Sequence, residues 1–411
     1  MREMRDSGVE WIGEIPKDWN CCKLKYRFTL INGRAFKDNE FEEDGTYRIL
    51  RVGNLFSNPV WYSSSLELEP DKYCEKGYLI YAWSMSYGPY IWNEEKVIYH
   101  YHIWKTKLSS NLNKKFAYYY LSALTDALKA KIHETTMGFI TMGVMNNSYI
   151  AFPCLKEQEI IVSFLDSKCS EIDAISADIQ KEIEILEQYK RSVITEAVTK
   201  GLNPDVEMKD SGVPWIGKMP ANWTCIKGKY ILKYMQKPVK TDDGVITCFR
   251  DGEVTLRSNR REDGFTMADK EIGYQGIDVG DLVVHGMDGF AGAIGISDSR
   301  GKASPVLNVL DSRQNKKYIM YYLRSMAYGD VFAALATGIR VRSCDLRWNK
   351  LSVLLYPVPP LEEQAEIVQY IEDTLNKVNG VISEKKQQLT VIDSYKKSLI
   401  YEYVTGKKEV I

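Results

Sequence analysis

Apolar side chains recur every seven residues along two long stretches of the chain. In the first stretch this step is made by Leu165, Ile172, Ile179, Leu186 and Val193, with Ile161, Ile175 and Ile183 beside them. In the second it is made by Ile371, Val378, Ile392 and Leu399, with Leu375, Ile382 and Leu389 on an adjacent line and Lys385 interrupting the step. Such heptads predict long α-helices that need a helical partner.

We therefore expect helices over residues 156–200 and 362–406, paired as an antiparallel coiled coil. Each would be about 65 Å long at 1.5 Å per residue. The alternative is that each helix packs only along its own globular domain.

The rest of the chain alternates short runs typical of β-strands with single helices. Strand-like runs lie at residues 47–52, 78–81, 97–99 and 281–284, and helical patterns at 113–132 and 316–327. The expected fold class is α+β, with globular domains over 1–155 and 203–361 separated by spacer helices over 156–202 and 362–411.

The framework of the chain occurs twice. Residues 4–19 (MRDSGVEWIGEIPKDW) and 208–223 (MKDSGVPWIGKMPANW) are identical at ten of sixteen positions. Leu155-Lys156-Glu157-Gln158 then returns as Leu361-Glu362-Glu363-Gln364, and Tyr189-Lys190-Arg191-Ser192 as Tyr395-Lys396-Lys397-Ser398. The segments between these repeats look unrelated. The pattern predicts one scaffold that presents two different surfaces.

The order of the repeats indicates a closed, pseudo-twofold arrangement. The first long helix continues into residues 208–212, whereas the matching segment for the second helix, residues 4–8, lies at the other end of the chain. We therefore expect the repeat to close as a circle.

Composition narrows the class of protein. The net charge is −1, so affinity for nucleic acid must come from local basic patches or from partners. The eight cysteines form no CxxC pair, which favours free thiols in a reducing cytoplasm over a disulfide framework or a zinc site. No apolar run approaches the ~18 residues that a membrane span needs, and the start lacks a signal peptide's apolar stretch. We expect a cytoplasmic protein without a membrane partner.

The repeated segments resemble the DNA specificity subunits of type I restriction-modification systems. The resemblance is carried by Trp11-Ile12-Gly13-Glu14-Ile15-Pro16, by Trp215-Ile216-Gly217-Lys218-Met219-Pro220, and by Pro359-Pro360 before Leu361-Glu362-Glu363-Gln364. The start of the first long helix departs slightly, because Pro153-Cys154 replaces the doubled proline.

The resemblance implies two target recognition domains, each reading one half of a split site in double-stranded DNA. It also implies that the helices space these domains and dock two methyltransferase subunits, and that motor-nuclease restriction subunits join for cleavage. The chain would then be a non-catalytic subunit without a cofactor that directs adenine methylation and restriction. A rod of about 65 Å spans roughly two ~34 Å turns of B-DNA, and unlike inserts predict an asymmetric site.

Candidate DNA contacts in the second insert are mostly arginines, which bind guanine bidentately or hold phosphates. The alternative for each is a solvated surface charge. One group comprises Arg250, Arg257, Arg260 and Arg261, and a second comprises Thr337, Arg340, Arg342 and Arg347. The resemblance adds His285, Met287 and Asp288.

The first insert is less basic and more aromatic. Its best polar candidates are Arg34, Lys37, Arg48, Arg51 and Asn54. Residues 83–88 are expected to form an exposed loop that offers Ser84, Ser86 and Tyr87. Thr135 and Thr136 occupy the place that corresponds to Thr337.

Three other motifs favour structural roles. The glycine-rich run over residues 286–295 does not have the GxGxxG spacing and suits turns and tight strand packing. Residues 58–61 suit a turn. His100 and His102 alternate on an expected strand but complete no metal set.

Two further functions remain open from the residues alone. The first is a structural adaptor whose paired domains bind proteins. The second is a self-contained enzyme with an unrecognised site, which no motif favours.

Overall fold

Two compact units form the computed structural model, which describes residues 2–56, 58–84, 86–133, 140–260, 272–335 and 346–410. Unit 1 comprises residues 1–179 with 387–411, and unit 2 comprises residues 180–386. The division cuts through both long helices, α3 (Leu155–Lys200) and α8 (Leu361–Val404). Their bounds confirm the two predicted helices to within two residues, and the α+β class is confirmed.

Besides its parts of α3 and α8, the described residues of unit 1 form short paired strands and the helices α1 and α2. β1 pairs with β2, and β3 pairs with β12, which directly precedes α3 in sequence. Two four-stranded sheets have the orders β4-β11-β8-β9 and β6-β5-β10-β7. The bounds are β1 Met4–Asp6, β2 Glu14–Pro16, β3 Asn20–Lys23, β4 Phe28–Asn32, β5 Tyr47–Leu50, β6 Tyr62–Ser64, β7 Tyr73–Cys74, β8 Leu79–Ala82, β9 Gly88–Ile91, β10 Val97–Tyr99, β11 Ile103–Leu108, α1 Lys114–His133, α2 Met142–Asn147 and β12 Tyr149–Phe152.

Unit 2 repeats this order of elements. The pairs β13–β14 and β15–β24 match β1–β2 and β3–β12, and the sheet β16-β23-β20-β21 matches β4-β11-β8-β9. The bounds are β13 Met208–Asp210, β14 Lys218–Pro220, β15 Thr224–Lys227, α4 Gly228–Ile231, β16 Leu232–Met235, β17 Ile246–Cys248, β18 Val254–Leu256, β19 Gln275–Ile277, β20 Leu282–His285, β21 Ile294–Ile296, β22 Gly301–Ala303, β23 Leu307–Ser312, α5 Lys316–Tyr328, α6 Val331–Ala334, α7 Trp348–Leu351 and β24 Leu355–Val358.

The two inserts therefore share one fold although their sequences look unrelated. Even the second sheet corresponds, because the parallel pairing of β5 with β10 returns as a parallel bridge between Val245 and Lys302. Sequence alone did not reveal this relation.

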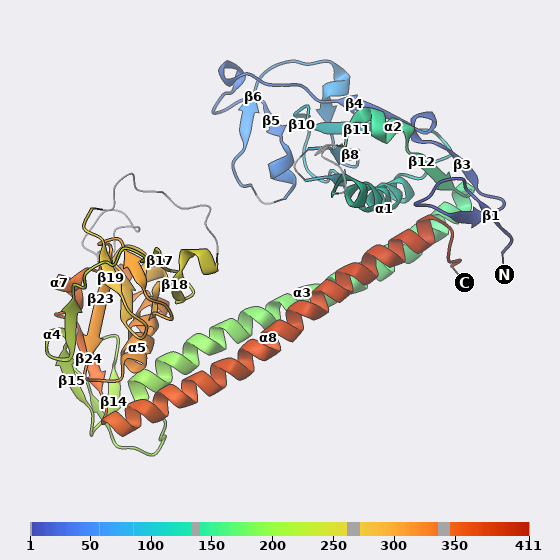
Figure 1. Cartoon of the computed structure of the whole chain (residues 1–411). Helices are drawn as coiled ribbons and strands as arrows, with labels where there is room; N and C mark the ends of the chain where they lie inside the picture. Colours follow the sequence, from blue (N-terminus) through green and yellow to red (C-terminus); the bar gives the residue numbers. More distant parts are fainter. Residues whose placement is uncertain are drawn as a thin grey trace. The chain divides into compact units, whose positions relative to one another are not determined.

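A helix packs on the main sheet of each unit through side chains spaced four residues apart. On α1 these are Phe116, Tyr120 and Leu124, and all three are buried. Figure 1 shows α1 running along one side of the strands that include β8 and β11. The Tyr120 hydroxyl donates to the Tyr149 carbonyl at 3.1 Å, which ties α1 to β12. This spacing places one stripe of the helix against the sheet.

The same anchor exists in unit 2. Tyr318, Tyr322 and Met326 form the buried stripe of α5, and the Tyr322 hydroxyl donates to the Leu355 carbonyl on β24 at 2.7 Å. A buried hydroxyl needs such a partner, so the tyrosine fixes the helix relative to the strand that leads into α8.

In unit 1 the long helices run antiparallel. The rings of Phe164 and Tyr403 lie 4.4 Å apart, and farther along the helices Lys396 donates to Asp173 at 2.6 Å. In unit 2, Lys385, the residue that interrupts the heptad, forms an ion pair with Glu182 of α3. The polar interruption is therefore compensated by charge on the partner helix.

One flanking position of the first heptad was predicted wrongly. Ile175 is 52 % exposed, whereas Cys169 and Ile183 are buried. The second apolar line runs four residues after each heptad position, so a residue three positions after Ile172 falls outside it. The same spacing of four holds on α8, where Ile382 follows Val378 and is buried.

The repeated motifs form the joint between each globular part and its long helix. In unit 1, Gln158 is fully buried; its Oε1 accepts from the Asn113 backbone N–H at 2.7 Å and its Nε2 donates to the Pro153 carbonyl at 2.9 Å. The neighbouring Glu157 accepts from Nε1 of Trp19 at 3.2 Å. One dipeptide thus holds the first turn of α3, the start of α1 and the N-terminal segment together.

The joint of unit 2 has the same bonds. Gln364 is fully buried, accepts from the Asn315 N–H at 2.9 Å and donates to the Pro359 carbonyl at 2.8 Å. Glu363 accepts from Nε1 of Trp223 at 3.0 Å. The repeated tryptophan, glutamate and glutamine are therefore explained by the scaffold itself and need no role in DNA recognition.

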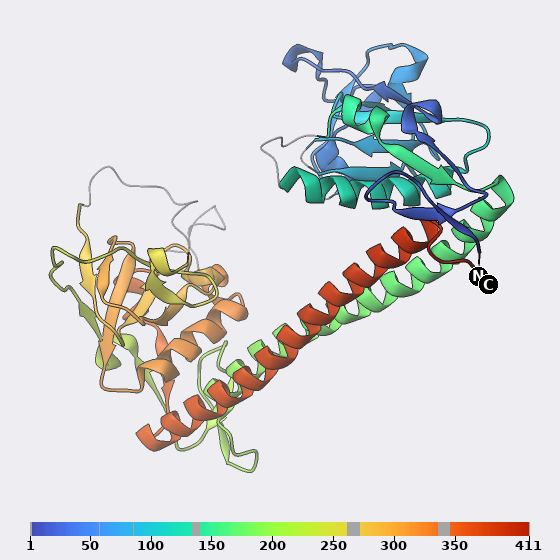
Figure 2. The ribbon, with the colours of Figure 1, turned by 45° about the vertical axis from the view of Figure 1, so that its right-hand side comes forward.

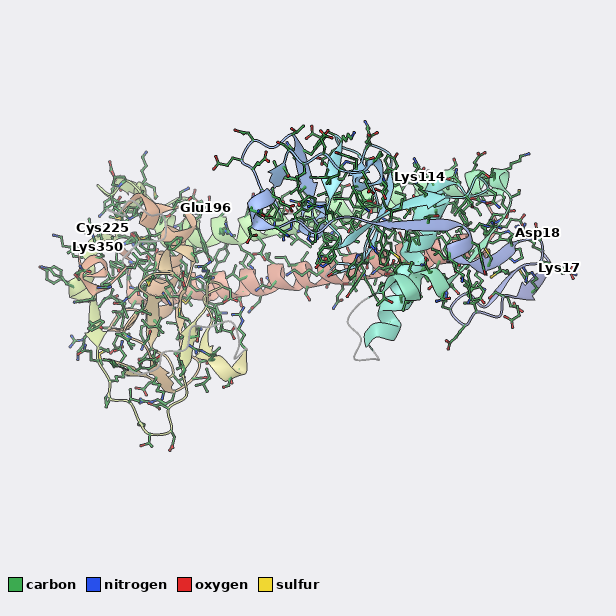
Figure 3. All side chains as sticks on the ribbon, turned by 90° about the horizontal axis from the view of Figure 1, so that it is seen from above. Lys17, Asp18, Lys114, Glu196, Cys225 and Lys350 are labelled. Atoms are coloured by element: carbon green, nitrogen blue, oxygen red, sulfur yellow. The ribbon has the colours of Figure 1, made fainter. Side chains whose placement is uncertain are left out.

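Unit 1 adds an ion pair at its joint. Arg2 pairs with Glu157 and with Asp18, the latter at 2.6 Å. Figure 3 shows Asp18 beside Lys17 on the N-terminal segment. Hydrogen bonds to Glu157 raise the pKa of Arg2, so the guanidinium stays charged.

Both long helices end at a glycine in the left-handed region. Gly201 has a φ of +74° and Gly406 of +72°, a conformation that side chains other than glycine rarely adopt. A Cβ on Gly406 would lie 2.4 Å from Pro16, and one on Gly201 would lie 3.2 Å from Trp223. Each helix end is thus packed against the hairpin motif of its own unit.

The N- and C-terminal segments of unit 1 lie together (Figure 2). The Tyr401 hydroxyl donates to the Trp11 carbonyl at 3.0 Å, and Lys407 donates to the Glu14 carbonyl. This placement supports the predicted circular closure. At the equivalent place in unit 2, the end of α3 and the hairpin that begins at β13 are joined by continuous chain.

A circular permutant is therefore expected to fold. Joining residue 410 to residue 2 by a short linker and opening the exposed loop at Asn203-Pro204-Asp205 cuts no strand or helix. We expect a soluble protein with cooperative thermal unfolding close to that of the parent. An insoluble or non-cooperative permutant, beside a well-behaved permutant opened in another exposed loop, would contradict the closed arrangement.

Candidate nucleic-acid interface

The loops predicted to contact DNA follow equivalent strands in the two units. Ala82, the last residue of β8, pairs with Ile103 of β11, and His285, the last residue of β20, pairs with Leu307 of β23. The loops after β8 and β20 therefore lie at the same end of two equivalent sheets. We call this end the strand tip. It includes Trp83 and residues 100–102 in unit 1, and Arg250, His285 and Asp288 in unit 2.

The strand tip of unit 2 contains a hollow of about 660 Å³. Five of the predicted site residues line it, namely Arg250, Arg257, Arg260, His285 and Asp288. They come from two separate stretches of sequence, residues 250–260 and 285–288, which the fold brings together. The sequence interpretation missed Thr247, Phe249, Asp251 and Ser304, which also line the hollow.

The arginines of this hollow differ in how they are held. Arg260 donates to Asp251 at 2.5 Å and to Glu253 at 3.0 Å, and its guanidinium lies 4.2 Å from the centre of the Phe249 ring. The hydrogen bond to Asp251 raises the pKa of Arg260. Arg257 donates from Nε to the Thr247 hydroxyl at 3.3 Å.

Arg250 is 68 % exposed and donates to Asp288 at 2.9 Å. It is the most exposed of these three arginines, since the Arg260 side chain is 38 % exposed and Arg257 is half-buried.

His285 fixes the loop that carries Asp288. Its Nδ1 accepts the backbone N–H groups of Met287 at 3.2 Å and of Asp288 at 2.9 Å. Burial lowers the pKa of His285, which keeps the imidazole neutral and Nδ1 free to accept. Met287 is 58 % exposed at the loop apex. Arg347 lies near this loop, because its neighbour Leu346 donates to the Gly286 carbonyl at 2.8 Å.

The strand tip of unit 1 is aromatic. Trp83 follows β8, and its backbone N–H donates to the His102 carbonyl at 3.1 Å. The Trp83 and His102 rings lie 5.1 Å apart, and those of His100 and His102 lie 4.7 Å apart. Arg34 joins this cluster through its backbone, which accepts from the Tyr101 N–H at 3.1 Å.

Predicted polar residues of unit 1 pack on aromatic rings or hold loops. Arg48 lies 5.4 Å from the Trp61 ring and Arg51 lies 5.0 Å from the Tyr62 ring. The Asn54 side chain donates to the Val60 carbonyl at 3.0 Å and accepts from the Arg51 N–H, which orders the turn after Asn58.

Arg34 forms an ion pair with Glu40 at 2.6 Å, and the backbone N–H of the exposed Lys37 donates to the same carboxylate.

Some expectations for unit 1 require correction. The loop over residues 83–88 is not exposed throughout, because Ser84 is only 5 % exposed and Gly88 begins β9. Ser86 and Tyr87 are half-buried. His100 and His102 do not alternate on a strand, because β10 ends at Tyr99 and residues 101–102 form a turn. A single parallel bridge to Arg34 continues the pairing to His100, and the turn that follows places the His102 ring 4.7 Å from the His100 ring.

Six predicted residues lie outside the described part of the chain. They are Thr135, Thr136, Arg261, Thr337, Arg340 and Arg342.

The glycine-rich run behaves as expected from tight packing. A Cβ on Gly295 would lie 1.9 Å from the Gly252 carbonyl, and one on Gly286 would lie 2.9 Å from the Val306 carbonyl. Within the described ranges no group of three His, Cys, Asp or Glu side chains is placed to hold a metal ion. In those ranges, too, no helix is long and apolar enough to cross a membrane.

His100 is expected to titrate near pH 4. Burial lowers its pKa to about 4, and the neighbouring His102 and Arg51 add to the shift. Because the folded-state pKa lies below the unfolded value of about 6.5, the unfolded chain binds the proton more readily. The stability held above pH 6.5 is therefore lost as the pH falls toward 4. NMR titration of the imidazole would check this, with His100→Gln to assign the signal. A midpoint near 6.5 would contradict the buried placement.

Comparison with known proteins gives consistent matches. Residues 16–185 match the family described as "Type I restriction modification DNA specificity domain". The chain is 22 % identical to the type I restriction enzyme EcoBI specificity subunit of Escherichia coli, over 99 % of this chain and 90 % of that protein. It is 24 % identical to the type I restriction enzyme MjaVIII specificity subunit of Methanocaldococcus jannaschii, over 74 % of this chain and 72 % of that protein.

A solved structure shares the fold. The match is to a chain from a study of complex assembly and conformational transition of the type I R-M system, with a TM-score of 0.65 and 13 % identity. It covers 96 % of this chain and 99 % of that chain. The resemblance seen in the repeated motifs is thereby confirmed.

Proposed function

We propose that this chain is a DNA specificity subunit of a type I restriction-modification system and that its two units read the two halves of one split, asymmetric DNA site. In this proposal residues 1–155 and 203–361 are the recognition domains, and residues 156–202 and 362–411 are the helices that separate them. The chain supplies recognition, while partner subunits supply the chemistry.

The proposal rests on one observation. The equivalent sheets of the two units end in different side chains. At the tip of unit 2 are Arg250, His285 and Asp288, whereas the tip of unit 1 presents Trp83 and the turn 100–102. Equivalent positions on one scaffold favour equivalent approach to a duplex. Different donors, acceptors and rings at those positions favour different base sequences.

The partners follow from the same scaffold. Two methyltransferase subunits would dock on the repeated framework, one at each equivalent joint, and motor-nuclease restriction subunits would join this complex. The bound DNA would then be methylated at adenine in each half-site. With a net charge of −1, the chain would rely on those partners for many phosphate contacts.

The long helices would set the separation of the half-sites. Removing residues 177–183 from α3 together with 385–391 from α8 deletes one heptad from each partner and keeps the remaining apolar lines in phase. The rod shortens by about 10 Å at 1.5 Å per residue, equivalent to about three base pairs. We expect unchanged half-sites with a gap shorter by about that amount.

Sequencing of modified bases in cells that co-express the methyltransferase subunit measures this gap. The matched control removes residues 177–183 alone, which unpairs the two helices and should abolish methylation. An unchanged gap in the doubly shortened chain would refute the spacer role.

A further inference from the structure

We propose that unit 2 recognises a G·C base pair through Arg250 and Asp288, the arginine contacting guanine and the carboxylate contacting the amino group of cytosine. The inference rests on the proposed function and names what the strand tip of unit 2 selects.

The pair has the donors and acceptor that this base pair requires. In the major groove guanine offers two acceptors, N7 and O6, and cytosine offers the N4 amino donor next to O6. Arg250 uses Nη2 to hold Asp288 Oδ1 at 2.9 Å, and the remaining N–H groups of its guanidinium can face guanine. Asp288 keeps lone pairs for the cytosine amino group. The donors of Arg250 therefore lie beside the acceptor of Asp288. This arrangement complements the base-pair edge, where the guanine acceptors lie beside the cytosine amino donor.

The carboxylate argues against a phosphate contact at Arg250. A phosphate within reach of this guanidinium would also face Asp288, and two anions at such a distance repel each other. A carboxylate at 2.9 Å from the guanidinium therefore weakens the attraction of Arg250 for a phosphate. A base edge, by contrast, carries an amino group that only an acceptor can satisfy. The acid at an exposed tip is therefore explained by base recognition.

The backbone around Asp288 is held before any DNA arrives. Its N–H donates to Nδ1 of His285 at 2.9 Å, and its carbonyl accepts from the N–H groups of Ala291 at 2.9 Å and Ala293 at 3.2 Å. Because this loop is already ordered, DNA binding costs it little conformational entropy, and the contact can select its base pair more sharply.

The backbone of Arg250 also packs closely against the loop that carries Asp288. Gly292 has a φ of +96°, and a Cβ there would lie 2.6 Å from the Arg250 carbonyl. The close approach brings the segment after β17 against the loop that carries Asp288.

Arg313 provides a matched control. It follows Ser312, the last residue of β23, and so lies at the opposite end of that strand from Leu307, which pairs with His285. Arg313 is exposed, and replacing it by lysine keeps the charge. This change should leave base selection unchanged.

The test compares methylation motifs. Cells co-express the methyltransferase subunit with the parent chain, Arg250→Lys, Asp288→Asn or Arg313→Lys, and modified bases are sequenced. Arg250→Lys keeps the charge but loses the two-pronged contact, and Asp288→Asn keeps the shape but adds a donor. We expect a G·C pair at one position of one half-site in the parent. Both variants should relax that same position about tenfold or more. Arg313→Lys should leave the motif unchanged, and the other half-site should stay unchanged in every variant.

Each other outcome has a defined meaning. The inference is overturned if the relaxed position holds an A·T pair, or if the two variants relax different positions. It is also overturned if methylation weakens at every site without relaxation, since that is the mark of a phosphate contact. The unchanged half-site shows that the variant chain is folded and assembled. A parent chain that directs no motif at all would instead count against the proposed function.

Discussion

A chain in which residues 4–152 also replace residues 208–358 is expected to direct methylation to a palindrome made of two copies of one half-site. Both segments begin at the repeated hairpin and end at the strand that leads into a long helix, β12 or β24. The shared strand order lets the graft present its tip in the place of the original one. A pseudo-twofold scaffold with two identical readers must select a symmetric site.

The joints make this graft feasible. Trp19 would meet Glu363 in the graft as Trp223 does now, at 3.0 Å through its indole N–H. Gln364 would meet the backbone of Asn113 in place of Asn315. The reverse graft, residues 208–358 in place of 4–152, should give the palindrome of the other half-site. A folded, assembled graft that still directed the parental asymmetric motif would contradict one reader per unit.

Replacing Gln364 by leucine is expected to lower the free energy of unfolding by about 2–4 kcal/mol. The substitution keeps the volume but leaves the Asn315 N–H and the Pro359 carbonyl buried without their partner. Each unsatisfied buried group costs about 1–3 kcal/mol. Gln158→Leu should cost about as much, since its bonds to Asn113 and Pro153 are the same.

Chemical denaturation of the purified chain measures the loss. Gln369→Leu is the matched control on the same helix, because Gln369 is exposed and donates to Asp373 at 2.9 Å on the surface. A surface change of this kind alters stability by less than about 0.5 kcal/mol. Equal effects of Gln364→Leu and Gln369→Leu would show that the repeated glutamines do not hold the joints.

The long helices and the circular order were predictable because their signals are local. Heptads place Leu165, Ile172 and Ile179 on one face whatever surrounds the helix, and the repeated hairpin needs only comparison of the chain with itself. The exposure of Ile175 was not predictable, since the neighbouring apolar line depends on the partner helix. The common fold of the two inserts was hidden for a related reason: sheet order is set by contacts far apart in sequence, and many side chains satisfy one register.

The candidate site, too, was predictable from the sequence only in part. Residue chemistry pointed to Arg250, the family resemblance added His285 and Asp288, and the fold then placed all three around one hollow. Sequence could not show that Asp288 pairs with Arg250, because 38 residues separate them. Nor could it show that Ser84 is buried or that Trp83 and the turn 100–102 form the tip of unit 1. Those placements depend on where β8 and β10 end against their neighbours.

The most direct test of the account is sequencing of modified bases in DNA from cells that express this chain with its methyltransferase subunit. Two readers of different chemistry on one scaffold predict methyladenine in a split, non-palindromic motif that disappears when this chain is omitted. A palindromic or unsplit motif, or methylation that persists without the chain, would contradict the claim that its two units read two different half-sites.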